Sequence, residues 1–348
     1  MFYEKIGQKE IKTIENSKNI DNSLVQCKTC SRECIVKENS YGFCYRRKNI
    51  NGKLYYINYN NFSAQSIDPI EKKPLYHFLP NSLSYSIGGY GCNMSCLNCQ
   101  NHSISQIKNE YNIINNDSIN NDSINNNTIN NNNSINNFMN IKNTMNDETN
   151  IENENNTYVK LESIGNKIVK NAINNNCKSI SFTYNEPTIH IEEYIQIAKI
   201  AQNNGLKTIF VSNGYMSNES LKYILKNVDA FNIDLKAYSN EFYKNICNAK
   251  LDIVLKNIKK IYKEKKHIEI TNLLINNLND FNEMIKSLVD FILNNLNDEV
   301  PLHFSRAFPN YKMNNIKPTK LETLKKAKKI AIDSGLENVY LGNMPIKY

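Results

Sequence analysis

Short apolar runs rich in β-branched residues alternate with longer segments of helical period along most of this chain. The runs expected to be strands are 84–89, 179–184, 208–213, 231–236, 268–274 and 302–306. The segments expected to be helices lie near 160–175, 189–204, 217–227, 250–265, 281–296 and 319–334. A strand followed repeatedly by a helix is the pattern of parallel βα units. The alternation therefore restricts the chain to an α/β fold around a parallel sheet.

Residues at the helix ends agree with this division. Gly205 and Gly335 follow two of the expected helices, and Ser217 is placed to cap the start of another. The first strand-to-helix turn carries cysteines and not the G-x-G-x-x-G of a doubly wound nucleotide-binding fold. We therefore favour a closed or a partial barrel over a doubly wound fold.

Polar residues gather where the expected strands end. In parallel barrels the chemistry lies at this carboxyl edge, where strands pass into βα loops. The residues concerned are Asn185, Glu186, Asn213, Gly214, Asp234, Lys236, His303 and Arg306.

Composition divides the chain into three parts. We expect an N-terminal cysteine-bearing segment at 1–80 and a barrel at 81–345. Within the barrel, 112–157 holds 21 asparagines in 46 residues, which bury too little apolar surface to offset chain entropy. We interpret 112–157 as a disordered surface insertion; the alternative is an asparagine-rich binding tract.

Charge and hydropathy exclude several classes of protein. No apolar stretch approaches the roughly 18 residues of a membrane helix, and the N-terminus resembles neither an export signal nor a transit peptide. The net charge of +8 is scattered along the helices, which argues against nucleic-acid binding. We expect a soluble protein of the cytoplasm or another reducing compartment.

Three thiols occur within eight residues, in the stretch C-N-M-S-C-L-N-C formed by Cys92, Cys96 and Cys99. A structural zinc site uses four protein ligands, whereas this spacing offers three. Cubane iron–sulfur clusters are held by thiolates, and three thiolates leave one iron open to another ligand. Gly88, Gly89 and Gly91 precede the thiols and allow backbone to approach a bulky cofactor closely.

A second group of cysteines precedes the barrel. It has the spacing C-x2-C-x3-C-x9-C and consists of Cys27, Cys30, Cys34 and Cys44. Four thiolates can close a structural zinc site or hold an auxiliary iron–sulfur cluster, and we favour a structural metal because no coordination position stays open. Cys177 and Cys247 lie in apparently helical stretches and are expected to be buried.

The C-x3-C-x2-C spacing after the first strand of a βα barrel resembles the signature of radical S-adenosylmethionine (SAM) enzymes. Further stretches are similar to the AmmeMemoRadiSam-system radical SAM proteins, relatives of pyruvate formate-lyase activating enzyme. These are G-C-N-M-S-C-L-N-C-Q-N, D-P-I-E-K-K-P-L-Y-H-F, T-Y-N-E-P-T, F-V-S-N-G-Y, F-N-I-D-L-K, H-F-S-R-A-F-P and V-Y-L-G-N-M-P.

The resemblance implies an α/β fold with a partial (β/α)6 barrel of the TIM type and an N-terminal cysteine-rich appendage. It further implies a [4Fe–4S] cluster on Cys92, Cys96 and Cys99, with SAM bound at the open iron. It also implies reductive cleavage of SAM to a 5′-deoxyadenosyl radical, with an electron donor such as a ferredoxin or flavodoxin. D-L-K favours a protein substrate, in the manner of a glycyl-radical activase. The alternatives are radical modification of a small metabolite or RNA, and a non-catalytic iron–sulfur sensor or scaffold.

The resemblance assigns two further residues to SAM. Glu186 stands in the turn that meets the SAM ammonium group; the alternative is that an acid beside Pro187 caps a helix. Asn213 ends a strand near SAM, although Asn-Gly is also a common turn.

Three more residues are implied at the same edge. Asp234 and Lys236 match the D-L-K motif, in which the lysine could meet the SAM carboxylate; a plain salt bridge is the alternative. His303 resembles a histidine close to SAM and could instead be a hydrogen-bonded core residue.

Overall fold

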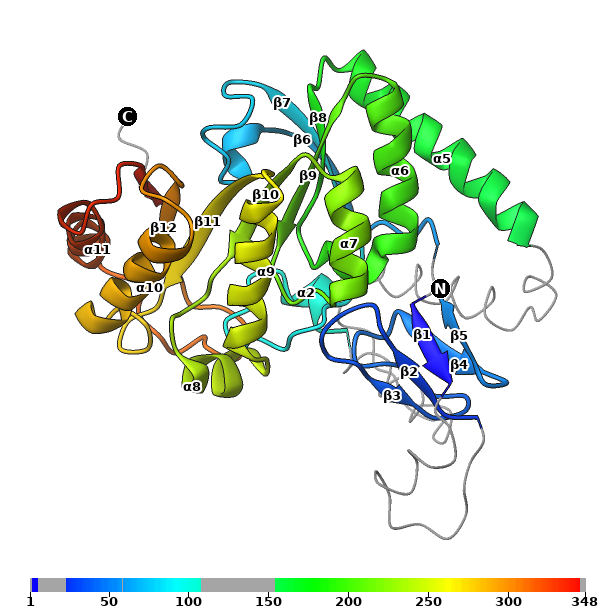
Figure 1. Cartoon of the computed structure of the whole chain (residues 1–348), viewed down its shortest axis with the longest axis horizontal. Helices are drawn as coiled ribbons and strands as arrows, with labels where there is room; N and C mark the ends of the chain where they lie inside the picture. The colour runs from blue at the N-terminus through cyan, green and yellow to red at the C-terminus, as the bar shows by residue number, and fades with distance from the viewer. Residues whose placement is uncertain (1, 6–22, 58, 108–153, 345–348) are drawn as a thin grey trace, which may run out of the picture.

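The computed structural model describes residues 2–5, 23–57, 59–107 and 154–344, and for 154–161 only the backbone. One large sheet carries most of the fold, in the order β13-β12-β11-β10-β9-β8-β7-β6 (Figure 1). Its strands are β6 (Ala64–Pro69), β7 (Leu83–Gly88), β8 (Ser179–Phe182), β9 (Lys207–Ser212), β10 (Ala230–Asp234), β11 (His267–Leu274), β12 (Leu302–Arg306) and β13 (Val339–Gly342).

All neighbours from β7 to β13 pair in parallel, whereas β6 is antiparallel to β7. The mostly parallel sheet with β6 and β13 at its edges confirms the α/β partial-barrel prediction. The six predicted strands are β7 to β12. The structure adds β13 as a seventh parallel strand and β6 as an antiparallel edge, which the search for repeated βα units did not include.

Helices follow the strands as predicted. They are α2 (His102–Ser105), α5 (Glu154–Asn174), α6 (Ile191–Asn203), α7 (Asn218–Asn227), α8 (Asn240–Phe242), α9 (Leu251–Lys263), α10 (Asn282–Asn295) and α11 (Leu321–Asp333), with short turns η1 (Ile70–Lys72), η3 (Pro187–His190) and the π-helical η4 (Tyr243–Cys247). Ser217 caps α7 through Ser220 N, and Gly205 and Gly335 adopt positive φ after α6 and α11, as expected.

Most of the predicted Asn-rich insertion, 112–153, lies outside the described residues. Its last four residues, 154–157, belong to the first turn of α5. Of the described helices, none has the length and apolar character to cross a membrane.

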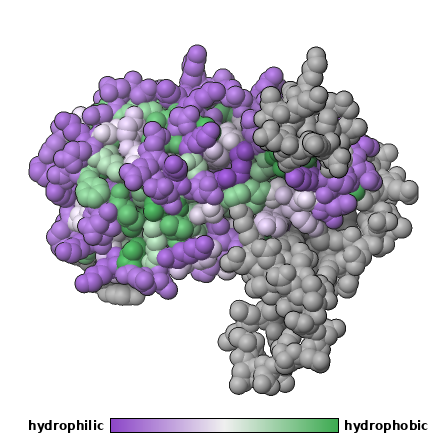
Figure 2. All heavy atoms as spheres, turned by 90° about the horizontal axis from the view of Figure 1, so that it is seen from below, coloured by the Kyte–Doolittle hydropathy of each residue, from purple (hydrophilic) through white to green (hydrophobic). Residues whose placement is uncertain are grey.

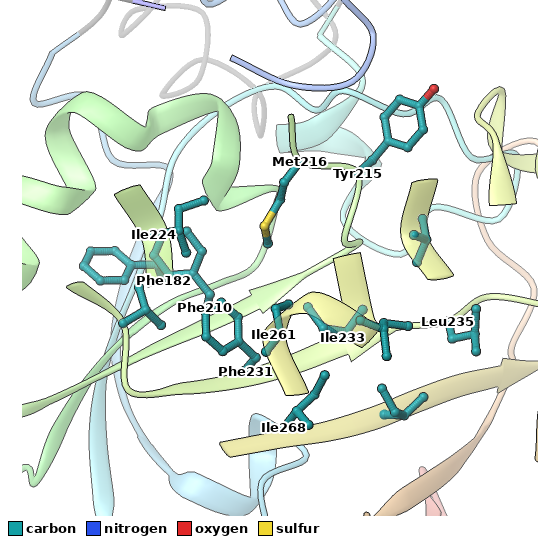
Figure 3. Close-up of a cluster of buried hydrophobic side chains, with 14 of the residues drawn as sticks. Phe182, Phe210, Tyr215, Met216, Ile224, Phe231, Ile233, Leu235, Ile261 and Ile268 are labelled. Atoms are coloured by element: carbon teal, nitrogen blue, oxygen red, sulfur yellow. The ribbon is translucent and has the colours of Figure 1, made fainter. Parts of the chain in front are cut away.

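The outer face of the sheet is apolar and packs against the helices. Figure 3 shows Phe182, Phe210 and Phe231, one from each of the neighbouring strands β8, β9 and β10. They lie close to Ile224 of α7 and Ile261 of α9. All of them are buried. Alternation along each strand sends the intervening residues to the other face, which becomes the inside of the partial barrel.

That inner face is unusually polar. Buried serines line it on β7 and β8, and Ser84 Oγ lies 2.6 Å from Ser181 Oγ. Farther along, register places Asp234, Thr271 and His303 in one row across β10, β11 and β12. The barrel interior is therefore built to hold polar groups, and each polar atom needs a partner there.

The chain after β6 fills part of this interior. Ile70 and Leu75 pack on Ile209 and Ala230 of the sheet. Lys73 is buried and pairs with Asp68 at 2.7 Å, and this pairing lowers the pKa of Asp68 although burial opposes it. Residues 70–78, which we term the inner segment, thus close off the sheet near the amino ends of its strands.

Glu269 of β11 fastens the inner segment. Its carboxylate accepts hydrogen bonds from the backbone N–H groups of Tyr76 (3.0 Å) and His77 (2.8 Å). It also lies 2.9 Å from His267 Nε2 and 2.7 Å from His303 Nε2. Burial alone would raise the pKa of Glu269, but these four donors lower it from 4.5 to about 2.

The first five described strands, β1 to β5, lie outside the main sheet and form two small sheets. β1 (Tyr3–Lys5), β2 (Val25–Cys27) and β3 (Ile35–Val36) make one, and β4 (Arg47–Ile50) with β5 (Lys53–Tyr56) makes the other. We call residues 23–57 the N-terminal unit.

Seen from below, the half of the molecule that holds β10 to β12 shows an area of hydrophobic residues bordered by hydrophilic ones (Figure 2).

Glu269→Gln tests the anchoring carboxylate. We expect the free energy of unfolding in urea to fall at pH 7 by about 3 kcal/mol, because a pKa lowered by about two units stabilises the ionised folded state. A lowered pKa contributes stability above about pH 4.5 that is lost as the pH falls towards 2. The difference between variant and parent should therefore shrink at pH 3.

Glu264→Gln, on the exposed turn after α9, is the matched control and should change little at either pH. An equal loss for Glu269→Gln at both pH values would show that shape, not charge, is what the carboxylate contributes.

Candidate functional site

The three-thiol loop begins where β7 ends. Gly91 has φ +89°, and a Cβ on it would lie 2.4 Å from the Cys44 carbonyl oxygen. A Cβ on Gly89 would lie 2.4 Å from the His190 ring. Glycine is required at both positions because the loop backbone lies against Cys44 and His190 with no room for a Cβ atom.

Asn185, which follows β8, holds the same glycines in place. Its Oδ1 accepts a hydrogen bond from Gly89 N at 3.1 Å, and its Nδ2 donates to Gly91 O at 2.8 Å. Its position at a strand end was noted in the sequence, but its role as a clamp on the thiol loop was missed. Only the fold shows that β7 and β8 are adjacent.

Each thiol of the loop has different surroundings. Cys92 Sγ accepts from Met94 N at 3.4 Å and from Asn213 Nδ2 at 3.7 Å. Cys99 is hydrogen-bonded by the Gln106 side chain, and Cys96 by the Cys247 thiol. Burial and the neighbouring charges raise the pKa of Cys92 and Cys99, whereas the contact with Cys247 lowers that of Cys96.

Asn213 is brought directly to the loop, as its position after β9 suggested. Besides Cys92 it donates to Asn93 Oδ1 at 2.8 Å, and its own Oδ1 accepts from Tyr215 N at 2.9 Å. The second contact is the local turn that Asn-Gly offered as the alternative, and the assignment of Asn213 to SAM stays a prediction.

Glu186 is 2% exposed and lies beside Asn213. Its Oε1 accepts from Thr188 N at 3.0 Å and Ser212 Oγ at 2.8 Å, and its Oε2 accepts from Asn213 N at 2.8 Å. The carboxylate thus caps η3, the alternative foreseen from Pro187, while also joining β8 to β9. Burial raises the pKa of Glu186, although these donors oppose the rise.

Asp234 and Lys236 form an ion pair of 3.0 Å, also the alternative foreseen. β10 ends at Asp234, so Lys236 follows the strand. The lysine is near Cys96 and Cys247 as well. Burial would lower its pKa, but the negative charge of Asp234 and of these thiols raises it well above its ordinary value.

His303 lies on the inner face of β12, two strands from Asp234 in the register row. It bonds to Glu269, and its ring stacks on Tyr340 with centroids 5.3 Å apart. It is 2% exposed and hydrogen-bonded, as the alternative of a core histidine describes, and its assignment to SAM stays a prediction. Its hydrogen bond and ring contacts are thus with Glu269, Tyr76 and Tyr340.

Cys27, Cys30, Cys34 and Cys44 come together in the N-terminal unit. Cys27 N donates to Cys34 O at 2.9 Å, and Cys30 lies within electrostatic range of the other three thiols. Burial, with repulsion from neighbouring thiols, raises the pKa of Cys30, Cys34 and Cys44. Thiols grouped in this way are stabilised as thiolates by a bound cation.

No three Cys, His, Asp or Glu side chains among the described residues converge at the spacing of a single metal ion. A cubane cluster does not need that spacing, because each thiolate binds a different iron. The donor chemistry of the three-thiol loop therefore fits a cluster. The four-thiol group offers the same soft donors, but its sulfur atoms do not converge at the spacing of one metal ion either.

The N-terminal unit contacts the three-thiol loop directly. Arg32, between Cys30 and Cys34, donates from Nε to Asn93 O at 2.8 Å and from Nη2 to Asn248 O. Ser31 N donates to Tyr215 O at 3.3 Å. Arg32 therefore links the four-thiol group, the three-thiol loop and the end of η4. The sequence around the two cysteine groups did not reveal this link.

Cys177 and Cys247 are buried, as predicted. Cys177 lies in the turn after α5 and contacts none of the other cysteines in the described contacts. Cys247 ends η4, and its contact with Cys96 was not anticipated because 151 residues separate the two in sequence.

Comparison with known proteins gives concordant matches. The family model described as the Radical SAM superfamily matches residues 86–291, more than half of the chain. An uncharacterized protein of Methanocaldococcus jannaschii is 37% identical over 345 residues, which cover 99% of this chain and 85% of that protein.

Two more distant matches are activating enzymes. The (2S)-3-sulfopropanediol dehydratase activating enzyme of Klebsiella oxytoca is 29% identical over 115 residues, 33% of this chain and 36% of that enzyme. A solved domain of pyruvate-formate lyase-activating enzyme from Bacteroides vulgatus has a TM-score of 0.43 and 20% identity, over 47% of this chain and 99% of that domain.

Arg32→Ala tests the link between the two thiol groups. We expect a loss of about 2 kcal/mol in the free energy of unfolding, since two hydrogen bonds from a charged donor disappear. We also expect faster iodoacetamide labelling of Cys92, Cys96 and Cys99, followed by peptide mass spectrometry, because the loop loses a restraint.

Lys222→Ala, on the exposed side of α7, is the control and should alter neither quantity. If Arg32→Ala lowers stability but leaves the labelling rates of the loop thiols unchanged, Arg32 stabilises only the N-terminal unit.

Proposed function

This chain belongs to the radical SAM superfamily, and on that basis we propose that Cys92, Cys96 and Cys99 hold its [4Fe–4S] cluster. Members of this family are enzymes that use such a cluster with SAM. The observation that carries the proposal is the C-x3-C-x2-C loop at the carboxyl edge of a parallel sheet, with one thiol hydrogen-bonded by Asn213. When bound, the two cofactors supply one-electron cleavage of SAM and removal of a hydrogen atom from a substrate.

The chain's own residues orient the site. Asn185 and the glycines fix the path of the loop, and the amide groups of Asn213 and Met94 donate to Cys92 Sγ. Donors of this kind stabilise thiolate charge and hold the sulfur in one position.

We assign Glu186 and Lys236 to the two charged ends of SAM. The ammonium group of SAM would face the Glu186 side, where the carboxylate meets the strand end beside Asn213. The carboxylate of SAM would face Lys236, whose positive charge lies near Cys96. Asp234 positions that lysine, and Asn213 lies between the loop and Glu186.

His303 has a weaker claim on SAM. Its contacts are with Glu269 and Tyr340, so we propose that it acts through the polar lining of the barrel interior and not by direct contact with the thiol loop.

For the four-thiol group we propose a structural metal, zinc in preference to an auxiliary cluster. Four thiolates would complete its coordination, and Arg32 within the group reaches the three-thiol loop. The metal would thus hold the N-terminal unit against the catalytic loop.

We further propose that the substrate is a protein, as for an activating enzyme. The match to the sulfopropanediol dehydratase activating enzyme supports this choice, together with the D-L-K motif of residues 234–236. An electron donor such as a ferredoxin or flavodoxin would supply the electron. A small metabolite and RNA remain the alternative substrate classes.

Anaerobic reconstitution with iron and sulfide, followed by SAM and dithionite, tests the cluster assignment. We expect the parent chain to bind about four irons at the loop and to form 5′-deoxyadenosine, and Cys99→Ala to lose both.

Cys30→Ser should instead lose one zinc, or a second set of irons. Cys177→Ala is the buried control and should behave as the parent. A parent chain with a full cluster and no 5′-deoxyadenosine would contradict the proposal.

The substrate class can be tested with an extract of the source cells divided by dialysis. We expect the macromolecular fraction to stimulate 5′-deoxyadenosine formation, and protease but not ribonuclease treatment to abolish the stimulation. Stimulation by the small-molecule fraction alone would indicate a metabolite, and sensitivity to ribonuclease would indicate RNA.

A further inference from the structure

A fourth thiol lies against the three-thiol loop. Cys247 is fully buried at the end of η4, a single turn of π-helix, and its side chain is hydrogen-bonded to Cys96. Sequence spacing gives no hint of the pair. It is the folded chain that provides four thiols here, although only three are in the motif.

Backbone hydrogen bonds on both sides of Cys96 fix this pair. Ser95 N donates to Cys247 O at 3.1 Å, and Leu97 N donates to Ile246 O at 2.9 Å. Asn248 Nδ2 donates to Ser95 Oγ at 3.2 Å. Because η4 is bonded to the residues before and after Cys96, the two side chains cannot move apart without breaking several contacts.

The D-L-K motif is joined to the same turn. Lys236 N donates to Tyr243 Oη at 3.1 Å, at the first residue of η4, while the lysine side chain pairs with Asp234. Charged and polar groups facing the Cys96–Cys247 pair are therefore Lys236, Asp234 and Tyr243. η4 carries the fourth thiol and also holds the lysine that we assign to SAM.

A fourth thiol so close to a cluster ligand has two possible roles, ligand or hydrogen-bond donor. Cys96 belongs to the C-x3-C-x2-C motif, whereas Cys247 is brought to it by η4. Cys92 and Cys99 receive their hydrogen bonds from amide groups, of Met94, Asn213 and Gln106. Cys96 has the Cys247 side chain in the equivalent place.

We propose that Cys247 is a positioning residue whose S–H group donates to Cys96 Sγ, and that this bond raises the reduction potential of the cluster. Hydrogen bonds to cluster sulfurs are one of the protein's means of setting that potential, because they stabilise the more negative reduced state. The inference rests on the proposed function, since it requires Cys96 to be a ligand. Full burial keeps the Cys247 thiol away from oxidants in solvent.

The test compares Cys247→Val, which keeps the volume and removes the donor, with Cys247→Ser, which restores a donor. Each full-length chain is reconstituted, its iron is counted, and its cluster midpoint potential is measured by redox titration followed by electron paramagnetic resonance, without SAM. We expect Cys247→Val to make reduction about tenfold less favourable, a shift of about −59 mV for one electron. Cys247→Ser should recover most of that shift.

Cys177→Val is the matched control, a buried cysteine away from the loop, and should keep the parent potential. A folded Cys247→Val chain with four irons and the parent potential would overturn the inference. So would a folded Cys247→Val chain that binds no cluster, because Cys247 would then be a ligand. Failure of the proposed function is distinguishable, since the parent chain itself would then bind no cluster at the loop or form no 5′-deoxyadenosine.

Discussion

An eight-residue loop with almost no regular secondary structure has to place three sulfur atoms, and its backbone groups need partners from elsewhere. Those partners come from every side. Asn185 holds the glycines before it, Arg32 and Gln106 donate to carbonyl groups within it, and η4 accepts from two of its N–H groups. The position of the sulfurs is therefore a property of the whole fold, and each supporting segment has to be in place.

The strand and helix pattern was readable from sequence because the outer face of the sheet and the helix faces that cover it are apolar, and strands and helices repeat their apolar residues with different periods. The residues at the carboxyl ends were readable for the same reason, since all strands of the parallel core end at one edge. Asn213 and the Asp234–Lys236 pair lie there as expected. Antiparallel β6 and the π-helical η4 were missed, because neither repeats the βα pattern.

Contacts between distant segments were beyond sequence reasoning. Nothing in the residues near Cys30 indicates that Arg32 reaches Asn93, or that Cys247 meets Cys96. His303 shows the opposite case. A histidine on an inner strand face can meet a cofactor or a buried acid, and only the position of Glu269 on the neighbouring strand decides which contact is made.

The close approach of Gly91 to the Cys44 carbonyl oxygen also bears on how such a chain can change over evolution. The N-terminal unit and the barrel share a boundary with no room for one methyl group, so neither can be exchanged as an independent module. A recombination that replaced residues 23–57 would have to recreate the same surface against the loop. The two cysteine groups are thus expected to be inherited together.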